Sequence, residues 1–251
     1  MRTTTDSSND LRLALATTLA LAVLNLTAAP APDKAAESIL FNDNDLTGWR
    51  PPAGAWQVVG AVALDKEDQK HFAPTPGKGV LLNSPTNNTV NLLTQEEYGD
   101  VEAHIEFVVP KNSNSGVYFQ GRYEIQVFDS FGVKTPKYND CGGVYGSCSG
   151  RAPEFPGRGP NVNASKPPGE WQSFDVVFRA PRFDAKGKKI EDAKFVKVTH
   201  NGQVIHENVE VPRPTCAARA LDEKPLGPLM LQGDHGPVAY RNLRLRKLDL
   251  K

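Results

Sequence analysis

Hydrophobic and polar residues alternate along much of the chain, most clearly between Asn112 and Asp129. This stretch opens with a turn-forming cluster, Asn112 to Gly116, and alternates strictly from Gly121 onward. Successive side chains of a strand point to opposite faces, so one face is apolar and the other polar. The apolar face comprises Tyr123, Ile125 and Val127, and the polar face comprises Arg122, Glu124 and Gln126.

The polar face of this predicted strand carries a cation, a carboxylate and an amide in a row. Such groups can hold sugar hydroxyls, and the carboxylate can also move a proton. The alternative is a solvated strand face with a cross-strand ion pair. Alternation alone favours that alternative, and a second polar cluster near the C-terminus favours a site.

A second alternating stretch runs from Val101 to Val109 and ends at Pro110. Because the stretch from Asn112 follows directly, we expect the two strands to be neighbours. The polar face is expected to be solvated, although neighbouring strands would let its residues enter the same cleft. That polar face comprises Glu102, His104 and Glu106.

Other strands are predicted along the rest of the chain. Gly169 to Arg179 reads as one strand, and Phe195 to Glu207 as a hairpin that turns at Asn201-Gly202. Trp56 to Leu64 reads as a hairpin around Gly60. Strands recur about every ten residues with turn signals between them, and no helical period is convincing beyond the N-terminus. The predicted fold is therefore all-β, a two-sheet antiparallel sandwich.

Composition agrees with this fold class. The chain has 251 residues, with 20 prolines and 21 glycines, which is typical of many short strands and turns. Its 29 basic and 29 acidic residues balance, so nothing indicates a nucleic-acid partner. An apolar fraction of 39% suffices for a core but is too low for a membrane protein. We expect a single domain over about residues 36–249.

The N-terminus has the pattern of a secretory signal. Leu11 to Ala29 is rich in Leu and Ala, follows Arg2 and Arg12, and ends in small residues. An N-terminal membrane anchor is the alternative, but the run is short for a stable span. We therefore assign residues 1–31 to a signal peptide and short linker, and expect an exported protein, periplasmic or extracellular, without a membrane span after cleavage.

Three cysteines remain in the mature chain: Cys141, Cys148 and Cys216. In an exported protein one disulfide is expected, with one thiol left over. The sequence allows Cys148 to pair with Cys141 or with Cys216. We predict the pair Cys141–Cys148, which closes a small loop and leaves Cys216 free.

Six motifs in order give the chain a resemblance to a known family: LFNDNDLTGW, NSNSGVYFQGRYEIQVFDS, GGVYG, PPGEWQSFDVVFRAPRFD, HNGQVIHENVEV and LQGDHGPVAYRNLRLR. Over about residues 38–249 the chain resembles the 3-keto-disaccharide hydrolase domain. The resemblance implies a concanavalin A-like jelly roll of the lectin/glucanase type. It also implies cleavage of glycosides already oxidised to a ketone at C3. The family's Gln-Asp-His-Gly appears here with Gly233 inserted, which would shift His235 relative to Glu124.

An ordinary retaining glycosidase needs two ionisable carboxyls about 5 Å apart. The related laminarinase motif places them along one strand, and here Gln126 occupies a position that cannot ionise. Glu124 and Asp129 are five residues apart, so a regular strand puts them on opposite faces unless a β-bulge intervenes. The direct two-carboxylate reaction is therefore disfavoured.

A ketone at C3 changes the chemistry, because it acidifies the proton on C2 and permits β-elimination of the group at C1. This reaction needs a base, donors to the enolate oxygen and an acid for the leaving group. His235 has a suitable pKa, and partial burial would make Glu124 suitable. Arg122, Gln126 or Arg241 can donate to the enolate. A divalent metal bound by His235, Asp234 and Glu124 can replace those donors.

The predicted site thus has catalytic candidates and substrate-binding candidates. A long Gly/Pro-rich segment, residues 141–168, is expected to flank it and to contribute Tyr145. The partner is a carbohydrate. A lectin-like binding module and an ordinary glucanase-type glycosidase remain as alternatives, and whether Glu124 and His235 face one pocket distinguishes an enzyme from a binding module. The catalytic candidates are Glu124, Asp234 and His235; the binding candidates are Asn114, Arg122, Gln126, Tyr145 and Arg241.

Overall fold

The computed structural model describes residues 37–148 and 154–251, and these residues form strands, turns and loops. In these two ranges no helix is long and apolar enough to cross a membrane. The expected signal peptide, within residues 1–31, lies outside the described residues.

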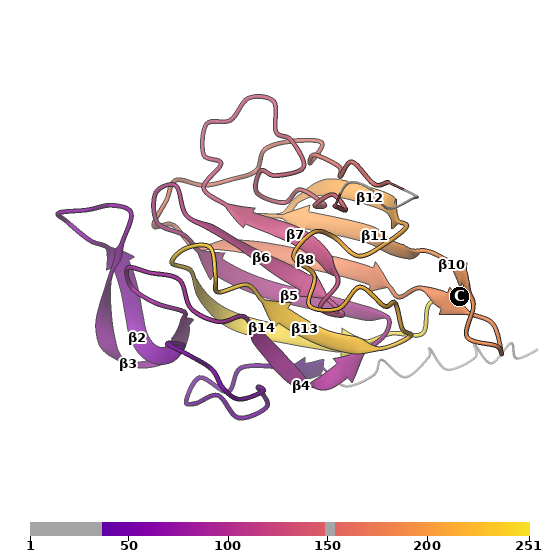
Figure 1. The fold of residues 1–251 in the computed structure, drawn as a ribbon. Helices are drawn as coiled ribbons and strands as arrows, with labels where there is room; N and C mark the ends of the chain where they lie inside the picture. The colour runs from indigo at the N-terminus through magenta and orange to yellow at the C-terminus, as the bar shows by residue number, and fades with distance from the viewer. Residues whose placement is uncertain (1–36, 149–153) are drawn as a thin grey trace, which may run out of the picture. The chain divides into compact units, whose positions relative to one another are not determined.

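Two antiparallel sheets pack face to face, with the smaller sheet in front of the larger one in Figure 1. The larger sheet has eight strands in the order β12-β11-β8-β5-β14-β3-β2, and β1 pairs with β14. The smaller sheet has four strands in the order β4-β13-β6-β7, and β9 and β10 form a separate pair. The predicted all-β, two-sheet antiparallel jelly-roll sandwich is therefore confirmed.

The strands of the larger sheet are β1 (Glu37–Ile39), β2 (Gln57–Leu64), β3 (Phe72–Leu82), β5 (Val101–Val108), β8 (Gln172–Arg179), β11 (Ala193–His200), β12 (Gln203–Val211) and β14 (Ala239–Lys247). Those of the smaller sheet are β4 (Leu92–Tyr98), β6 (Asn114–Phe119), β7 (Tyr123–Phe128) and β13 (Gly227–Leu231). The small pair consists of β9 (Arg182–Phe183) and β10 (Lys189–Glu191).

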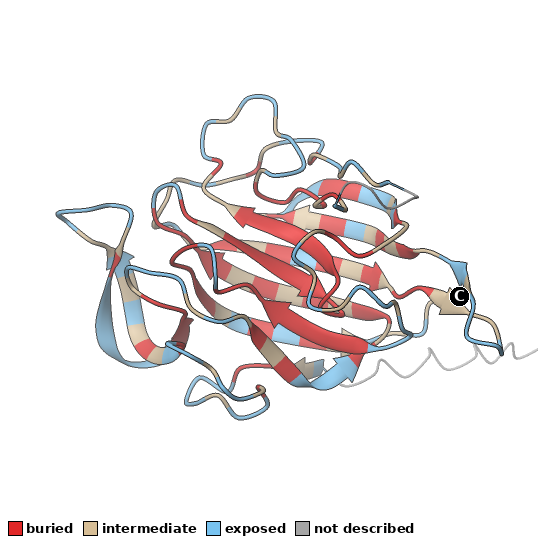
Figure 2. Cartoon of the chain, viewed as in Figure 1, coloured by how far each residue is buried: buried red, intermediate tan, exposed pale blue. Residues whose placement is uncertain are grey.

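The core lies between the sheets and follows the predicted alternation. The apolar face of β7 is fully buried there, and so is the apolar face of β5. Figure 2 shows the difference between the layers: β6, β7 and β13 are buried along almost their whole length, whereas buried and more exposed positions alternate along strands of the larger sheet. The smaller sheet is thus covered on its outer face as well, which a solvated sheet face would not be.

Of two predicted hairpins, one is confirmed and the other is wrong. The hairpin at Asn201-Gly202 is confirmed, and both residues have positive φ (49° and 80°), as a two-residue β-hairpin turn requires. The hairpin around Gly60 is wrong, because β2 runs through this residue and pairs with β3. Gly60 marks a shift in register instead, at a point where a Cβ would lie 2.8 Å from the carbonyl oxygen of Pro76.

The expectation that the two alternating stretches are neighbouring strands is also wrong. β5 belongs to the larger sheet and β6 to the smaller one, so the chain crosses between layers at Pro110 to Ser113. The polar face of β5 and the polar face of β7 consequently lie on opposite outer faces of the sandwich. His104 and Glu106 therefore do not enter the pocket that contains Glu124.

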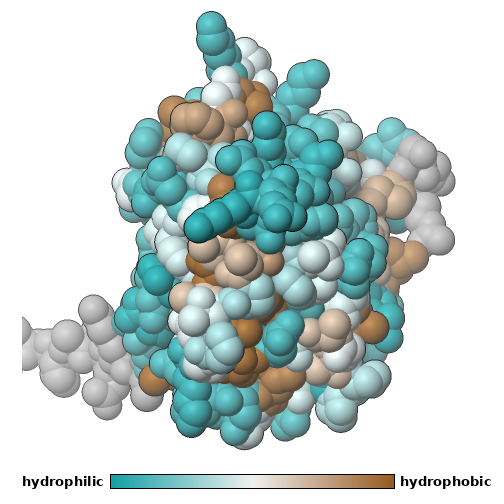
Figure 3. Space-filling model, turned by 90° about the vertical axis from the view of Figure 1, so that its left-hand side faces the viewer, coloured by the Kyte–Doolittle hydropathy of each residue, from teal (hydrophilic) through white to brown (hydrophobic). Residues whose placement is uncertain are grey.

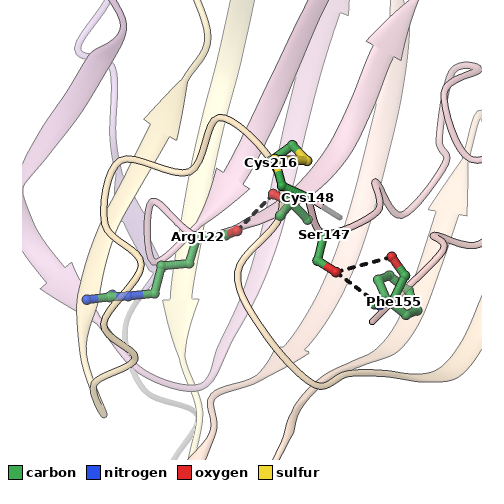
Figure 4. Close-up of a disulfide and its surroundings, with 6 residues drawn as sticks. Arg122, Ser147, Cys148, Phe155 and Cys216 are labelled. Carbon is green, nitrogen blue, oxygen red and sulfur yellow. Dashed lines mark hydrogen bonds between the residues drawn. A yellow bond between two sulfur atoms is a disulfide. The ribbon is translucent and has the colours of Figure 1, made fainter. Parts of the chain in front are cut away.

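The disulfide joins Cys148 to Cys216, not Cys148 to Cys141 (Figure 4). The two Cα atoms lie 4.9 Å apart although 68 positions separate them in sequence. Cys141 is instead a buried free thiol in the core. The sequence allowed both pairings, and the fold selects the long-range one by bringing the segment around Cys216 beside that around Cys148, where the Cys216 amide donates to the Gly146 carbonyl at 3.0 Å.

Candidate active site

The outer face of the smaller sheet carries polar side chains from β6 and β7. Tyr118 lies directly opposite Glu124, and Gly116 lies opposite Gln126. Since alternate residues share a face, Asn114, Gly116 and Tyr118 belong to the same surface as the two β7 residues. The pattern that predicted one polar strand thus describes half of a two-strand platform.

A loop borders this platform at the edge formed by β7, where Val144 pairs with Ile125. The segment around Gly142 to Tyr145 runs along β7 and exchanges backbone hydrogen bonds with it: Gly142 donates to Gln126 at 2.8 Å, and Gln126 donates to Gly143 at 2.9 Å. The Tyr145 amide donates to the carbonyl of Glu124 at 3.1 Å. Glu124 and Gln126, beside this segment, are each only 3% exposed. The predicted site-flanking loop therefore contacts the platform.

A pocket of about 200 Å³ lies on this platform, and Tyr145 of the bordering loop contributes to its lining. Pockets for drug-sized ligands run to about 300–1,000 Å³, so this one suits a single sugar ring. It contains Glu124 and His235 together, which was the geometric condition that separated an enzyme from a binding module. Its lining comprises Asn114, Tyr118, Glu124, Gln126, Tyr145, Cys216, Ala217, Gln232 and His235.

The carboxyl of Glu124 is held in an apolar setting. Burial raises its pKa to about 8; a hydrogen bond from the Tyr118 hydroxyl opposes this rise and the negative charge of Asp234 adds to it. No cation lines the pocket within the described residues apart from the half-exposed His235. A carboxyl that titrates near neutral pH can gain and lose a proton during turnover.

Gly116 makes room for this carboxyl. A Cβ at this position would lie 2.2 Å from Oε1 of Glu124, closer than any side chain tolerates. The glycine therefore serves the close approach of Glu124 to the β6 backbone, and its φ is not in the positive region that favours glycine.

Asp234 and His235 come from the loop after β13. Nδ1 of His235 lies 2.6 Å from Oδ1 of Asp234, and because an ionised carboxylate only accepts, Nδ1 carries the proton and Nε2 is left free. The inserted Gly233 is fixed by the Asn91 side chain, which accepts from its amide at 2.9 Å. Despite this insertion His235 lines the pocket with Glu124. The insertion does not separate the two residues.

Three amide side chains in the lining have a buried oxygen without a hydrogen-bond partner: Asn114 Oδ1, Gln126 Oε1 and Gln232 Oε1. The nitrogens of the two glutamines are used, since Gln126 donates to the Asn139 carbonyl at 3.2 Å and Gln232 donates to the Tyr118 hydroxyl at 3.3 Å. Buried acceptors in native proteins are almost always paired. Three acceptors without a partner among the described residues thus belong to side chains that line one pocket.

Two predicted binding residues lie elsewhere. Arg122 sits in the turn before β7, and its guanidinium donates to the carbonyls of Asp222 (2.7 Å) and Gln120 (2.9 Å). Figure 4 shows this side chain pointing away from the disulfide that borders the pocket. Arg241 lies on the outer face of the larger sheet, paired with Glu106 at 2.7 Å and stacked on Trp171. Neither arginine faces the pocket, because each guanidinium is bound by other groups of the protein: backbone carbonyls for Arg122 and the Glu106 carboxylate for Arg241.

A comparison with known protein families assigns the chain to one of them. The profile of the 3-keto-alpha-glucoside-1,2-lyase-like domain matches residues 37–246. The chain belongs to this family. The resemblance predicted from six motifs is therefore confirmed, and the chain is a carbohydrate-active, glycoside-cleaving type of enzyme. Among curated proteins, none matches this member of the 3-keto-alpha-glucoside-1,2-lyase-like family significantly.

Solved structures similar to this family member share its fold. Three are proteins of Parabacteroides distasonis that carry the provisional description of a glycosyl hydrolase. The first is 24% identical, with 84% of each chain covered and a TM-score of 0.61. The second is 20% identical over 85% of this chain and 100% of that one (TM-score 0.55), and the third 16% identical over 85% and 94% (TM-score 0.52). At these identities the likeness shows the fold alone.

The metal hypothesis finds no matching donor set in this family member. No group of three or more His, Cys, Asp or Glu side chains in the described ranges is arranged to hold an ion. Asp234 pairs with His235, and the Glu124 carboxyl accepts from Tyr118 in a buried setting that favours its neutral form. We therefore derive no step through a metal.

Four lining residues escaped the sequence analysis: Tyr118, Cys216, Ala217 and Gln232. Tyr118 belongs to β6, whose alternation continues from Asn114 through Gly116, so the pattern itself contained the signal. Gln232 stands at the start of the Gln-Gly-Asp-His-Gly motif and its amide donates to the Gly116 carbonyl at 2.9 Å. Cys216 and Ala217 could not be found by pattern, because the disulfide places them.

Proposed function

We propose that this protein cleaves 3-keto-glycosides by removing the C2 proton and eliminating the group at C1. The observation that carries the proposal is the shared pocket: a buried carboxyl with a pKa of about 8, a histidine oriented by an aspartate, and three unpaired amide oxygens. The family description, a 3-keto-alpha-glucoside-1,2-lyase-like domain, agrees with this chemistry.

In the proposed reaction Glu124 is the base. Its carboxylate takes the proton from C2, and the electron pair of the C–H bond forms an enolate on the C3 oxygen. The Tyr145 hydroxyl and the Asn114 amide line the pocket as donors for that oxygen. When the ketone reforms, the C1–O1 bond breaks and the electron pair leaves with O1, which accepts the Nε2 proton of the His235 imidazolium while Nδ1 still donates to Asp234. The product is an enone with a C1–C2 double bond, and addition of water across it completes net hydrolysis.

Direct displacement by two carboxylates is less consistent with the site. Glu124 is the one carboxylate among the described residues that line the pocket. Asp129, the other candidate, accepts from the Asn112 backbone at 2.9 Å through Oδ2 and does not line it. A retaining mechanism needs a nucleophile and an acid at about 5 Å, and this lining supplies a single carboxyl.

We also propose that the protein is exported. The N-terminal pattern motivates this proposal. A disulfide such as that between Cys148 and Cys216 is typical of proteins in an oxidising compartment. Fractionation of the cells that produce the protein, with N-terminal sequencing of the mature chain, tests it. Intact protein that begins at Met1 in the cytosol would contradict export.

The activity test uses matched sugars, 3-keto-trehalose and trehalose, incubated with the purified protein in D₂O, with and without EDTA. We expect cleavage of the oxidised sugar alone, with deuterium at C2 of the released 3-keto-glucose. Equal cleavage of both sugars would return the protein to the glucanase-type glycosidases. Binding of either sugar without cleavage would favour the lectin-like alternative.

A further inference from the structure

A second and larger pocket, of about 420 Å³, opens beside the first. His235 lines both pockets. The chain is also continuous between them, since Asn112 and Ser113 line the second pocket and Asn114 lines the first. The remaining lining residues of the second pocket are Lys70, His71, Thr86, Asn87, Asn88, Lys111, Gly236 and Pro237.

Two turns build the cationic side of this pocket. Lys70 belongs to the turn between β2 and β3, and Lys111 to the crossing between β5 and β6. The turns are tied together, because the Lys111 amide donates to the carbonyl of Gln69 at 2.9 Å. The Lys70 amide donates in turn to the Asp68 side chain at 3.0 Å. Figure 3 views the end of the molecule where the β2–β3 turn projects, and hydrophilic side chains gather there.

The charge of the second pocket is one-sided. Its lining contains two lysines and two histidines and no carboxylate among the described residues. Neither Lys70 nor Lys111 forms an ion pair within the described ranges, whereas His71 lies 3.4 Å from Asp68 and His235 lies 2.6 Å from Asp234. Two ammonium groups held on joined turns, without a protein counter-ion, favour an anion in the space between them.

We propose that the second pocket is the leaving-group subsite and that it accepts an anionic leaving group, a sugar or aglycone with a carboxylate or phosphate. This inference rests on the proposed function. With the oxidised ring in the first pocket, the bond to be cleaved lies at the junction of the two pockets. His235 stands at that junction, where an acid must protonate the departing oxygen.

The test compares two leaving groups that differ in charge and not in size. The substrates are the 4-carboxyphenyl and 4-carbamoylphenyl 3-keto-glucosides of the same anomer. We expect kcat/KM to favour the carboxylate by about tenfold at low ionic strength, the scale of one charge-assisted contact. The Lys70→Gln/Lys111→Gln variant should reduce this preference to about onefold. Added salt should weaken the preference of the wild type.

The control is Lys66→Gln, which removes one positive charge, where the double variant removes two, from the turn that carries Lys70 and at a residue outside the pocket lining. It should keep the preference. Competition by glucuronate and by glucose 6-phosphate, against glucose, then distinguishes a carboxylate-selective pocket from a phosphate-selective one. Wild-type cleavage of both substrates at equal rates, or a preference that survives in the double-lysine variant, would overturn the subsite assignment and leave the proposed function intact. Cleavage of neither substrate would contradict the proposed function itself.

Discussion

Glu106 and Glu124 occupy equivalent places in two similar sequence patterns, yet the fold treats them in opposite ways. Glu106 lies on the outer face of the larger sheet, where burial alone would raise its pKa but hydrogen bonds from Arg241 and Asn242 outweigh that effect and lower it. Glu124 lies on the outer face of the smaller sheet, where burial dominates and raises the pKa to about 8. The Glu106 carboxylate is paired with Arg241, whereas no lysine or arginine among the described residues lines the pocket of Glu124.

The difference comes from what covers each face. The outer face of the larger sheet is open enough for ion pairs to form between neighbouring strands, as between Arg241 and Glu106, whose side chains are 39% and 20% exposed. On the smaller sheet, the segment around Gly142 borders the polar row, and the described residues that line the pocket bring no lysine or arginine to it. A carboxylate in a polar row thus has a structural role where a cation pairs with it. It is suited to proton transfer where it is buried without a paired cation.

The largest contrast is expected from removing each carboxylate in turn. Glu124→Gln should lower kcat on a 3-keto-glucoside by about 10²–10⁴, because the proton-accepting group is lost. Glu106→Gln should leave kcat within about twofold, since its side chain does not line the pocket. Steady-state kinetics of both variants measures the contrast. Equal losses in the two variants would mean that neither effect is specific to the pocket.

The second contrast is the pH dependence of stability. Between the ordinary carboxyl pKa near 4.5 and the folded value of about 8, the folded protein keeps a proton on Glu124 that the unfolded chain releases. The stabilisation is therefore complete below about pH 4.5 and is lost as the pH rises through 8. We expect the wild type to lose about 3–4 kcal/mol of unfolding free energy between pH 5 and pH 8, relative to Glu124→Gln.

Urea denaturation at several pH values measures this loss. Glu106 provides the opposite sign, since its lowered pKa stabilises the fold above its unfolded value and that stabilisation is lost as the pH falls. Parallel stability curves for the wild type and Glu124→Gln across pH 5 to 8 would show that the Glu124 carboxyl is ionised in the folded protein throughout.

A smaller effect is expected from filling the space beside Glu124. Gly116→Ala places a Cβ 2.2 Å from Oε1 of Glu124, so the carboxyl must move. A displacement of about 1 Å in a catalytic group costs up to about 10²-fold, and we expect kcat/KM to fall by about 10- to 100-fold. Gly99→Ala is the matched control: its Cβ lies 3.3 Å from Cδ2 of Leu226, outside the pocket. The idea fails if the two alanine variants are equally active.

The smallest effect is expected from the ion pair on the larger sheet. A double-mutant cycle with Glu106→Gln and Arg241→Met should give a coupling energy of about 1 kcal/mol or less, because both groups are partly solvated. Urea denaturation of the four proteins measures it. A coupling of several kcal/mol would show that this face is as sheltered as the site and would remove the distinction drawn above.

The sequence identified much of the site, and each of its wrong predictions has a specific cause. Glu124, Gln126, Asn114, Tyr145 and His235 line one pocket as the motifs suggested. Arg122 was misplaced because alternation was extended backward past Tyr123, into a turn where side chains no longer follow the period of a strand. The cysteine pairing was misjudged because short loops and long loops are equally compatible with a cysteine count.

The sequence by itself determined the two-sheet sandwich, the inner face of each alternating strand and the family, because these depend on local periodicity and on motifs in order. The tertiary structure alone decided which polar row is enclosed, which cysteines meet, and that a cationic pocket adjoins the site. Those features join residues far apart in the chain, such as Cys148 and Cys216 at a separation of 68 or Ser115 and Gln232 at 117. A period of two specifies which face a side chain is on, and only the packed chain specifies what covers that face.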